Sequence, residues 1–285
     1  MPLPNLLHIP GFVRWGVRLD TAPAGWWIAA QCAALWPTWR WMGQRLADGS
    51  DDPLGVLALG ALGVLLWTTR QALRAAPLLP WLALALLGTV AATAAASALP
   101  PLLAGVVAML ALACTLRAFL PARVATLPVA GLAVLALPLL SSLQFYAGYP
   151  LRVLTAEASG WLLSLGYVVQ REGSTLLVAG RLVIVDAPCS GVQMAWLGYF
   201  TACTVALWAG LPNKNFMARL PLVSMLVLAG NILRNSVLVA GEASGRPLGP
   251  LAHEAFGLLC LAMVCGGIAW AMSRPAPATA GTATR

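Results

Sequence analysis

"LLPWLALALLGTVAATAAASA" (residues 78–98) is followed, two residues later, by "PLLAGVVAMLALACTLRAFL" (residues 101–120). These two stretches of about 20 residues contain one charged residue between them, Arg117. A helix rises about 1.5 Å per residue, so each stretch is long enough to cross the hydrocarbon core of a bilayer, which is about 30 Å thick. The pair predicts two membrane-spanning helices joined by a short turn.

Similar apolar blocks recur along the whole chain. The chain has 285 residues, of which 60% are hydrophobic and 9% charged, whereas a soluble domain has about 25% charged residues. We therefore predict an all-α polytopic membrane protein with about eight transmembrane helices. The predicted spans are residues 25–42, 53–69, 78–98, 101–120, 127–146, 190–211, 219–240 and 251–272.

The charged residues predict how the spans are oriented. An even number of spans places both termini on one side of the membrane. If that side is the cytoplasm, its segments carry ten Lys or Arg residues and the other side six, in accord with the positive-inside rule. Asp20 is then the one cytoplasmic acid of nine. This rule accounts for the net charge of +8, and no nucleic-acid-binding motif is present, so we expect no nucleic acid partner.

A long extracytoplasmic segment precedes the sixth span. Its first part has Val153, Leu154, Ala158, Trp161, Leu162 and Leu165 on one face at helical spacing, which predicts a short amphipathic helix at the membrane interface. "STLLVAG" and "RLVIVDA" then predict a β-hairpin that turns at Ala179-Gly180. We divide the chain into N-terminal transmembrane helices (1–146, about five spans), a second region with three spans (147–272) and a disordered cytoplasmic tail (273–285).

One of the six cysteines lies in an unusual setting, "APCSG" at residues 187–191. Pro188 suits a first helical turn, Ser190 can cap a helix, and Gly191 permits close approach of backbone or substrate. Cys189 would then lie at a helix N-terminus, where the helix dipole lowers a thiol pKa and favours the nucleophilic thiolate. The alternative is an inert interfacial cysteine. No cysteine or histidine spacing indicates a metal site, and we expect no cofactor.

Two further polar residues lie near the outer ends of the last two spans. Arg234, in "NILRNSVL" (231–238), is about 9 Å inside the seventh span, where an arginine is costly and marks a functional site unless it extends to the headgroups. His253 opens the eighth span in "GPLAHEAFGLL" (249–259) and is either a general base or a solvated interfacial histidine. We do not expect Glu254 to orient it, because adjacent helical residues point apart.

The predicted topology brings Cys189, Arg234 and His253 to the same membrane face. A nucleophile, a cation and a base in one layer form a plausible site for covalent acyl transfer. The cation would bind a carboxylate or stabilise an oxyanion. The sequence leaves open how Arg234 and His253 divide these roles.

At these residues the chain resembles the exosortase/archaeosortase family of integral-membrane cysteine transpeptidases. The matching motifs are "APCSG" (187–191), "NILRN" (231–235) and "HEAFG" (253–257), within about residues 148–272. The resemblance implies that Cys189, Arg234 and His253 are catalytic and that residues 147–272 form the catalytic region. We expect four polar neighbours to contact the substrate: Ser190, Gln193, Asn231 and Asn235.

The resemblance also implies the substrate, the membrane and the reaction. Expected substrates are secreted proteins whose C-terminal tail has a Pro-containing motif such as the PEP-CTERM signal, a transmembrane helix and a basic stretch. The enzyme, a thiol protease and transpeptidase, would cleave this sorting signal in the bacterial cytoplasmic (inner) membrane, at the extracytoplasmic face. The acyl group would pass to an envelope acceptor such as a membrane lipid, another amine or water.

Gln193 departs from this pattern, because many family members carry a basic residue soon after "CSG". This difference predicts a divergent subfamily with its own recognition signal. Alternatives to the transpeptidase are a membrane acyltransferase with a cysteine nucleophile, a small-solute transporter that uses Arg234 as an anion site, and a structural subunit of an export complex.

Overall fold

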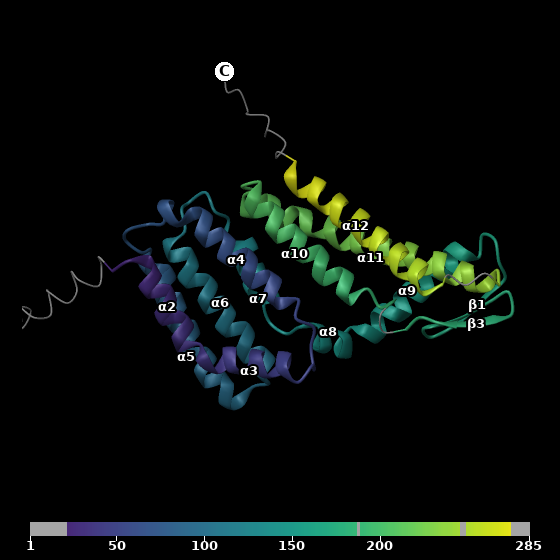
Figure 1. Ribbon diagram of the computed structural model, residues 1–285, viewed down its shortest axis with the longest axis horizontal. Helices are drawn as coiled ribbons and strands as arrows, with labels where there is room; N and C mark the ends of the chain where they lie inside the picture. Colours follow the sequence, from purple (N-terminus) through teal and green to yellow (C-terminus); the bar gives the residue numbers. More distant parts are fainter. Residues whose placement is uncertain (1–21, 187–188, 246–248, 275–285) are drawn as a thin grey trace, which may run out of the picture.

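The computed structural model describes residues 22–186, 189–245 and 249–274. Helices dominate these residues, as predicted, and the chain forms an elongated molecule with a small sheet at one end (Figure 1). The elements are α2 (Ala24–Ala34), α3 (Trp36–Ala47), α4 (Gly55–Thr69), η1 (Arg70–Ala72), α5 (Leu79–Ala98), α6 (Pro101–Phe119), α7 (Thr126–Leu135), α8 (Leu140–Tyr146), α9 (Gly148–Leu163), β1 (Val169–Glu172), β2 (Thr175–Val178), β3 (Arg181–Ile184), α10 (Val192–Trp208), α11 (Asn213–Ala243) and α12 (Pro250–Ser273).

Within the described residues, four helices are long and apolar enough to cross a membrane: α5, α6, α11 and α12. Helices α7 and α8 would together make a fifth span, but they are bent by 86° at their junction. The predicted spans 53–69 and 190–211 correspond to α4 and α10, which have 15 and 17 residues and rise only about 22 and 26 Å. The count of eight spans is therefore not confirmed.

Proline residues explain two interruptions of the predicted spans. The first span, 25–42, divides into α2 and α3, and Pro37 lies in the first turn of α3. Pro138 lies between α7 and α8. Proline lacks an N–H donor and clashes with the preceding helical turn, so a helix often ends before it or has it in its first turn, although α11 continues through Pro221. The bend turns α8 toward the start of α10, which it contacts.

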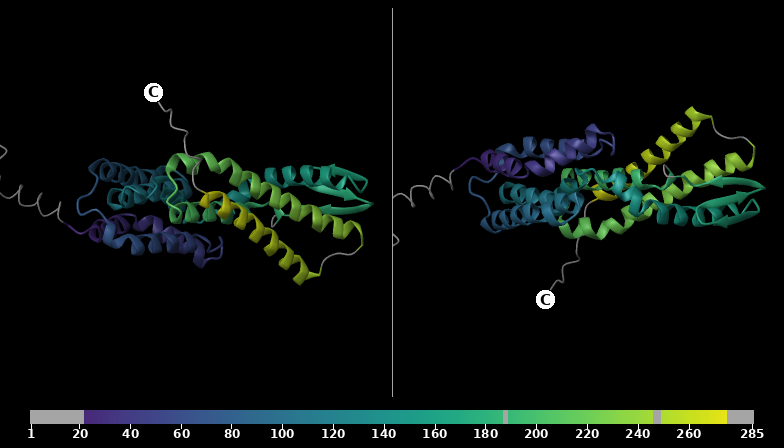
Figure 2. Two further views of the ribbon diagram at one scale, coloured as in Figure 1. Left: turned by 90° about the horizontal axis from the view of Figure 1, so that it is seen from above. Right: turned by 90° about the horizontal axis from the view of Figure 1, so that it is seen from below.

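The three C-terminal helices pack closely because glycine lies at their contacts. A Cβ on Gly198 of α10 would lie 2.6 Å from the Val227 side chain of α11. A Cβ on Gly230 of α11 would lie 2.2 Å from the Val264 side chain of α12. The absent side chains let the helix backbones approach closely. Helix α12 then diverges from α11 toward Pro250 (Figure 2).

The segment before α10 contains the predicted hairpin and one strand that the sequence did not reveal. Strands β2 and β3 are antiparallel, with Val178 paired to Arg181 across the predicted turn, so the hairpin is confirmed. The predicted amphipathic helix corresponds to α9, but it ends at Leu163, before the last residue of the predicted face, Leu165. Residues Val169–Glu172 form β1, which pairs antiparallel with β2 through a turn at Gly173 (φ +58°).

The faces of α9 also differ in residue size. Small residues such as Thr155, Ala156, Ser159 and Gly160 are buried, and α9 packs along α11 through this face. The large apolar residues Leu154, Trp161, Leu162 and Leu165 are exposed. The predicted apolar face is therefore directed away from the protein, as expected for a helix that contacts lipid at an interface.

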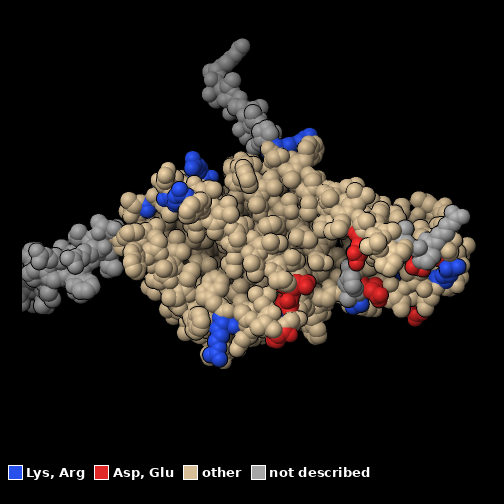
Figure 3. All heavy atoms as spheres, in the orientation of Figure 1, with Lys and Arg blue, Asp and Glu red and all other residues tan. Residues whose placement is uncertain are grey.

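The two ends of the helices carry different charges. Arg74, Lys214 and Arg219 lie where α6 ends and α11 begins, and Arg219 donates to the Arg274 carbonyl at the end of α12. All eight described acidic residues lie toward the opposite end, in the α3–α4 loop, in or beside the α9–sheet segment, or near the junction of α11 and α12. Figure 3 shows acidic groups along the lower and right parts of the molecule.

Predictions that rest on residues 1–21, Pro188, Arg246 and the tail from residue 275 lie outside the described residues.

Candidate active site

Cys189 lies in a short turn between the sheet and α10. Its backbone N–H donates to the Asp186 carbonyl at 2.9 Å. Gly191 precedes the first residue of α10 with a φ of +83°, which a residue with a side chain rarely adopts. A Cβ there would also lie 2.8 Å from Cγ of Asn231. Glycine at this position therefore lets the Cys189 turn lie directly against α11.

Asn231 and Asn235 hold this turn from α11. Their side-chain Nδ2 atoms donate to the carbonyl oxygen of Cys189 at 3.0 and 3.1 Å. Asn231 also donates to Oγ1 of Thr155 on α9 at 3.1 Å. Both asparagines are buried, with 2% of each exposed. Their amide groups bind the backbone of the proposed nucleophile and so fix its position; contact of the two asparagines with substrate stays a prediction.

Ser190 is held from the opposite direction, by α8. Its hydroxyl donates to Oε1 of Gln144 at 2.9 Å and accepts from the Val192 N–H at 3.3 Å. The N-cap of α10 is Gly191, so the prediction that Ser190 caps this helix is wrong, although its hydroxyl does bind the first N–H of the helix. Sequence reasoning did not identify Gln144. The available signal was an uncharged amide at the end of an otherwise apolar block, in "LSSLQFY".

Arg234 lies on α11 between the two asparagines, and its guanidinium rests against α12. A Cβ on Gly257 would lie 3.2 Å from Nε of Arg234. Gly257 is one helical turn after His253 on the same face of α12, so the Arg234 guanidinium meets that face one turn along from the histidine. The missing side chain at Gly257 provides the space for the guanidinium.

Arg234 and His253 line one cavity of about 450 Å³, which we call the α10–α12 cavity. Its other polar or small lining residues are Gly191, Gln193, Glu254 and Gly257, and four apolar side chains complete it. Among the described residues that line this cavity, the nearest to Cys189 in the chain is Gly191, two residues further on. The Cys189 side chain itself packs beside the buried cluster that includes Val239. The structure thus brings Arg234, His253 and Gln193 together in one cavity, and Cys189 lies outside its lining, two residues from Gly191. Glu254 also lines this cavity, beside the histidine.

The electrostatic surroundings of Cys189 differ from the prediction. Burial raises the pKa of the Cys189 thiol above its usual value; the positive charge of Arg234 opposes this increase, and Asp186 adds to it. The predicted lowering of this pKa by the helix N-terminus is therefore wrong, because desolvation of the thiolate dominates. A thiol in this state needs a base to remove its proton before it attacks.

Comparison with known protein families identifies the chain. A family model described as transmembrane exosortase (Exosortase_EpsH) matches residues 41–270. No curated protein and no solved structure matches the chain. The match begins in α3, well before the motifs around Cys189, Arg234 and His253, and includes the α3–α4 loop and the α7–α8 bend. The chain is therefore a membrane protein that belongs to the transmembrane exosortase family, a family of cysteine transpeptidases and proteases.

Proposed function

We propose that this protein is a membrane cysteine transpeptidase that cleaves the C-terminal sorting signal of secreted proteins and transfers them to an envelope acceptor. One observation carries the proposal: Arg234 links the other two proposed catalytic residues. It is flanked by the asparagines that hold the Cys189 carbonyl, and its charge acts on the Cys189 thiol. Its guanidinium lies against Gly257, and it lines the same cavity as His253. An intramembrane arginine in such a position marks a functional site.

The first half of the reaction forms a thioester. His253 removes the proton from the Cys189 thiol, and the sulfur attacks the carbonyl carbon of the scissile peptide bond. Arg234 stabilises the oxyanion that forms, since a guanidinium donates hydrogen bonds to developing negative charge. The C–N bond then breaks, and His253 returns the proton to the leaving amine. The products are the acyl-enzyme and the released C-terminal tail.

The substrate class follows from the family and from the shape of the site. The apolar part of the α10–α12 cavity suits the transmembrane helix of a sorting tail, with the peptide bond before the helix presented to Cys189. The substrates are secreted proteins with a Pro-containing motif, a transmembrane helix and a basic stretch. In this proposal the site faces the extracytoplasmic side of the bacterial inner membrane, and both termini are cytoplasmic.

The alternatives from the sequence make different predictions. A membrane acyltransferase would use the same thiol but carry a fatty acyl group on Cys189, so the mass of the trapped thioester separates it from a transpeptidase. A transporter would function without the thiol. Membership in a family of cysteine transpeptidases and proteases favours the transpeptidase.

The C termini of secreted proteins in the native strain provide the test. Chromosomal Cys189→Ala and Cys189→Ser variants are compared with the wild type by mass spectrometry of C-terminal peptides. We expect a group of envelope proteins to retain their C-terminal tails in both variants, because no thioester can form. Cys265→Ala is the matched control, since Cys265 lies in α12 outside the α10–α12 cavity and its loss should change no C terminus.

Immunoblots of the membrane fraction establish that all variants are present at wild-type abundance. Tails that are still removed normally in a stably produced Cys189→Ala variant would exclude the nucleophile and with it the proposed function.

A further inference from the structure

A second cavity shares a wall with the α10–α12 cavity. It has a volume of about 370 Å³ and lies between the α3–α4 loop, α8 and the start of α10; we call it the α8–α10 cavity. Its polar lining includes Asp51, Asp52, Ser141, Gln144, Ser190 and Gln193. Gln193 lines both cavities. Ser190 directly follows Cys189, so the α8–α10 cavity also reaches the residue next to the proposed nucleophile.

A transpeptidase needs access of this kind from two directions. After the first half-reaction the acyl group is attached to Cys189, and the second substrate must reach the same carbonyl carbon. The α10–α12 cavity contains the acyl group, Arg234 and His253. The α8–α10 cavity approaches the Cys189 turn along Ser190 and Gln193, from the side on which α8 lies.

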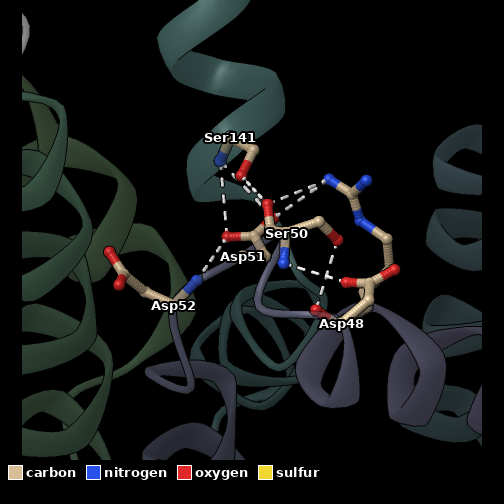
Figure 4. A network of polar contacts seen from close by, with 6 residues as sticks. Asp48, Ser50, Asp51, Asp52 and Ser141 are labelled. Carbon is tan, nitrogen blue, oxygen red and sulfur yellow. Dashed lines mark hydrogen bonds and ion pairs between the residues drawn. The ribbon is translucent and has the colours of Figure 1, made fainter.

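The charge of the α8–α10 cavity indicates what it binds. Figure 4 shows that the Asp51 carboxylate is part of a fixed network: it accepts from the Ser141 N–H at 3.3 Å and the Asp52 N–H at 2.9 Å, and it lies 3.7 Å from Nη2 of Arg45. The arginine thus compensates Asp51. The Asp52 side chain is exposed, lines the cavity, points away from this network and has no hydrogen bond or ion pair with another described residue. One negative charge at the cavity wall therefore remains uncompensated, and it attracts a cation.

We propose that the α8–α10 cavity is the acceptor site of the transpeptidase, and that it binds a primary amine in its ammonium form beside Asp52. This inference rests on the proposed function and adds the second substrate to it. The bound ammonium loses one proton to water, and the amine nitrogen attacks the thioester carbon. A C–N bond forms and the C–S bond breaks. His253 takes the second nitrogen proton and returns it to the Cys189 sulfur, which restores the thiol and the imidazole.

The test measures how the acyl-enzyme divides between transfer and hydrolysis. Native membranes that contain the full chain, and a substrate protein found by the C-terminal comparison above, are supplied with 1,2-diaminoethane or with hydroxylamine. At neutral pH the diamine carries an ammonium group that Asp52 can bind before that nitrogen loses its proton and attacks, whereas hydroxylamine is uncharged and gains nothing from Asp52. Mass spectrometry gives the ratio of amine adduct to hydrolysed product.

We expect Asp52→Asn to lower the diamine ratio about threefold to fivefold, the effect of one partly exposed charge contact, and to leave the hydroxylamine ratio and the total cleavage unchanged. Asp48→Asn is the matched control, because Asp48 is an exposed acid of the same loop that is not part of the cavity wall. It should change neither ratio. In membranes without added amine, the mass of the transferred group distinguishes a lipid amine from a water-soluble one, and its yield should fall in Asp52→Asn.

An unchanged diamine ratio in Asp52→Asn, or an equal loss of both adducts, would overturn the acceptor site. Neither result bears on the assignment of Cys189 as the nucleophile, which the Cys189 variants test through cleavage alone.

Discussion

At the scale of single residues, the Cys189 carbonyl shows how the site is held in place. Two buried amides donate to it, and each such hydrogen bond contributes about 1 kcal/mol net. The sequence marks Asn231 and Asn235 as polar residues in an apolar block, but it does not reveal their partner. That partner lies 42 and 46 residues away, and tertiary packing alone brings it to α11.

The charges around the Cys189 thiol predict that two substitutions shift its pKa in opposite directions. Arg234 lowers the pKa of Cys189 and Asp186 raises it. In a chain whose other five cysteines are replaced by alanine, Arg234→Gln should shift the alkylation of Cys189 by iodoacetamide to higher pH, because the thiolate loses a stabilising cation. Asp186→Asn should shift it to lower pH. The rate of alkylation measured across a pH series gives both shifts, and shifts of the same sign in the two variants would contradict this arrangement of charges.

At the scale of helices and strands, local signals predicted some elements and not others. The Val- and Ile-rich runs around Ala179-Gly180 identified β2 and β3, since the turn and the strand residues agree. Strand β1 was missed because "GYVV" continues the apolar spacing of the preceding helix. The right-angled bend between α7 and α8 was missed because hydropathy measures the length of an apolar block but not its direction.

The contact between Gly257 of α12 and Arg234 of α11 predicts the effect of adding a methyl group where these helices meet. In Gly257→Ala the new methyl group would lie 3.2 Å from Nε of Arg234 and would displace the flexible guanidinium from its position. We expect the cleavage rate to fall about tenfold or more, as for other small misplacements of a catalytic group, with normal membrane abundance. Gly266→Ala is the control on the same helix, because its Cβ meets no atom within 4 Å. Substrate cleavage in native membranes measures both rates; equal rates for the two variants would show that Arg234 does not depend on this gap.

At the scale of the whole molecule, the distribution of charge is what the sequence predicted best. Charged residues are few and most lie outside the predicted apolar blocks, so their position near the helix ends depends little on detailed packing. The convergence of α8, α10 and α11 on the Cys189 turn could not be predicted in the same way, since it depends on helix bends and glycine contacts that hydropathy does not report.

The separation of charge predicts on which side of the membrane two exposed residues, Glu172 and Lys214, can be labelled. In a chain without native cysteines, we expect Glu172→Cys, in the sheet, to react with a membrane-impermeant maleimide in intact spheroplasts. Lys214→Cys, at the start of α11, should react only after the membrane is permeabilised. Both residues are exposed, so a difference in labelling reports the side of the membrane. The reverse pattern would invert the proposed orientation of the active site.

The divergence of α12 from α11 has a consequence for how a substrate enters. Its outward side chains near the open end, including Leu251, Leu258 and Leu259, are apolar and exposed, and Leu258 also belongs to the α10–α12 cavity. If the proposed function holds, a groove with such a rim would admit the hydrophobic helix of a sorting tail sideways from the bilayer, without threading it through a tunnel. Substrate capture would then be a two-dimensional search in which the incoming segment exchanges lipid contacts for protein contacts and never has to pass through water.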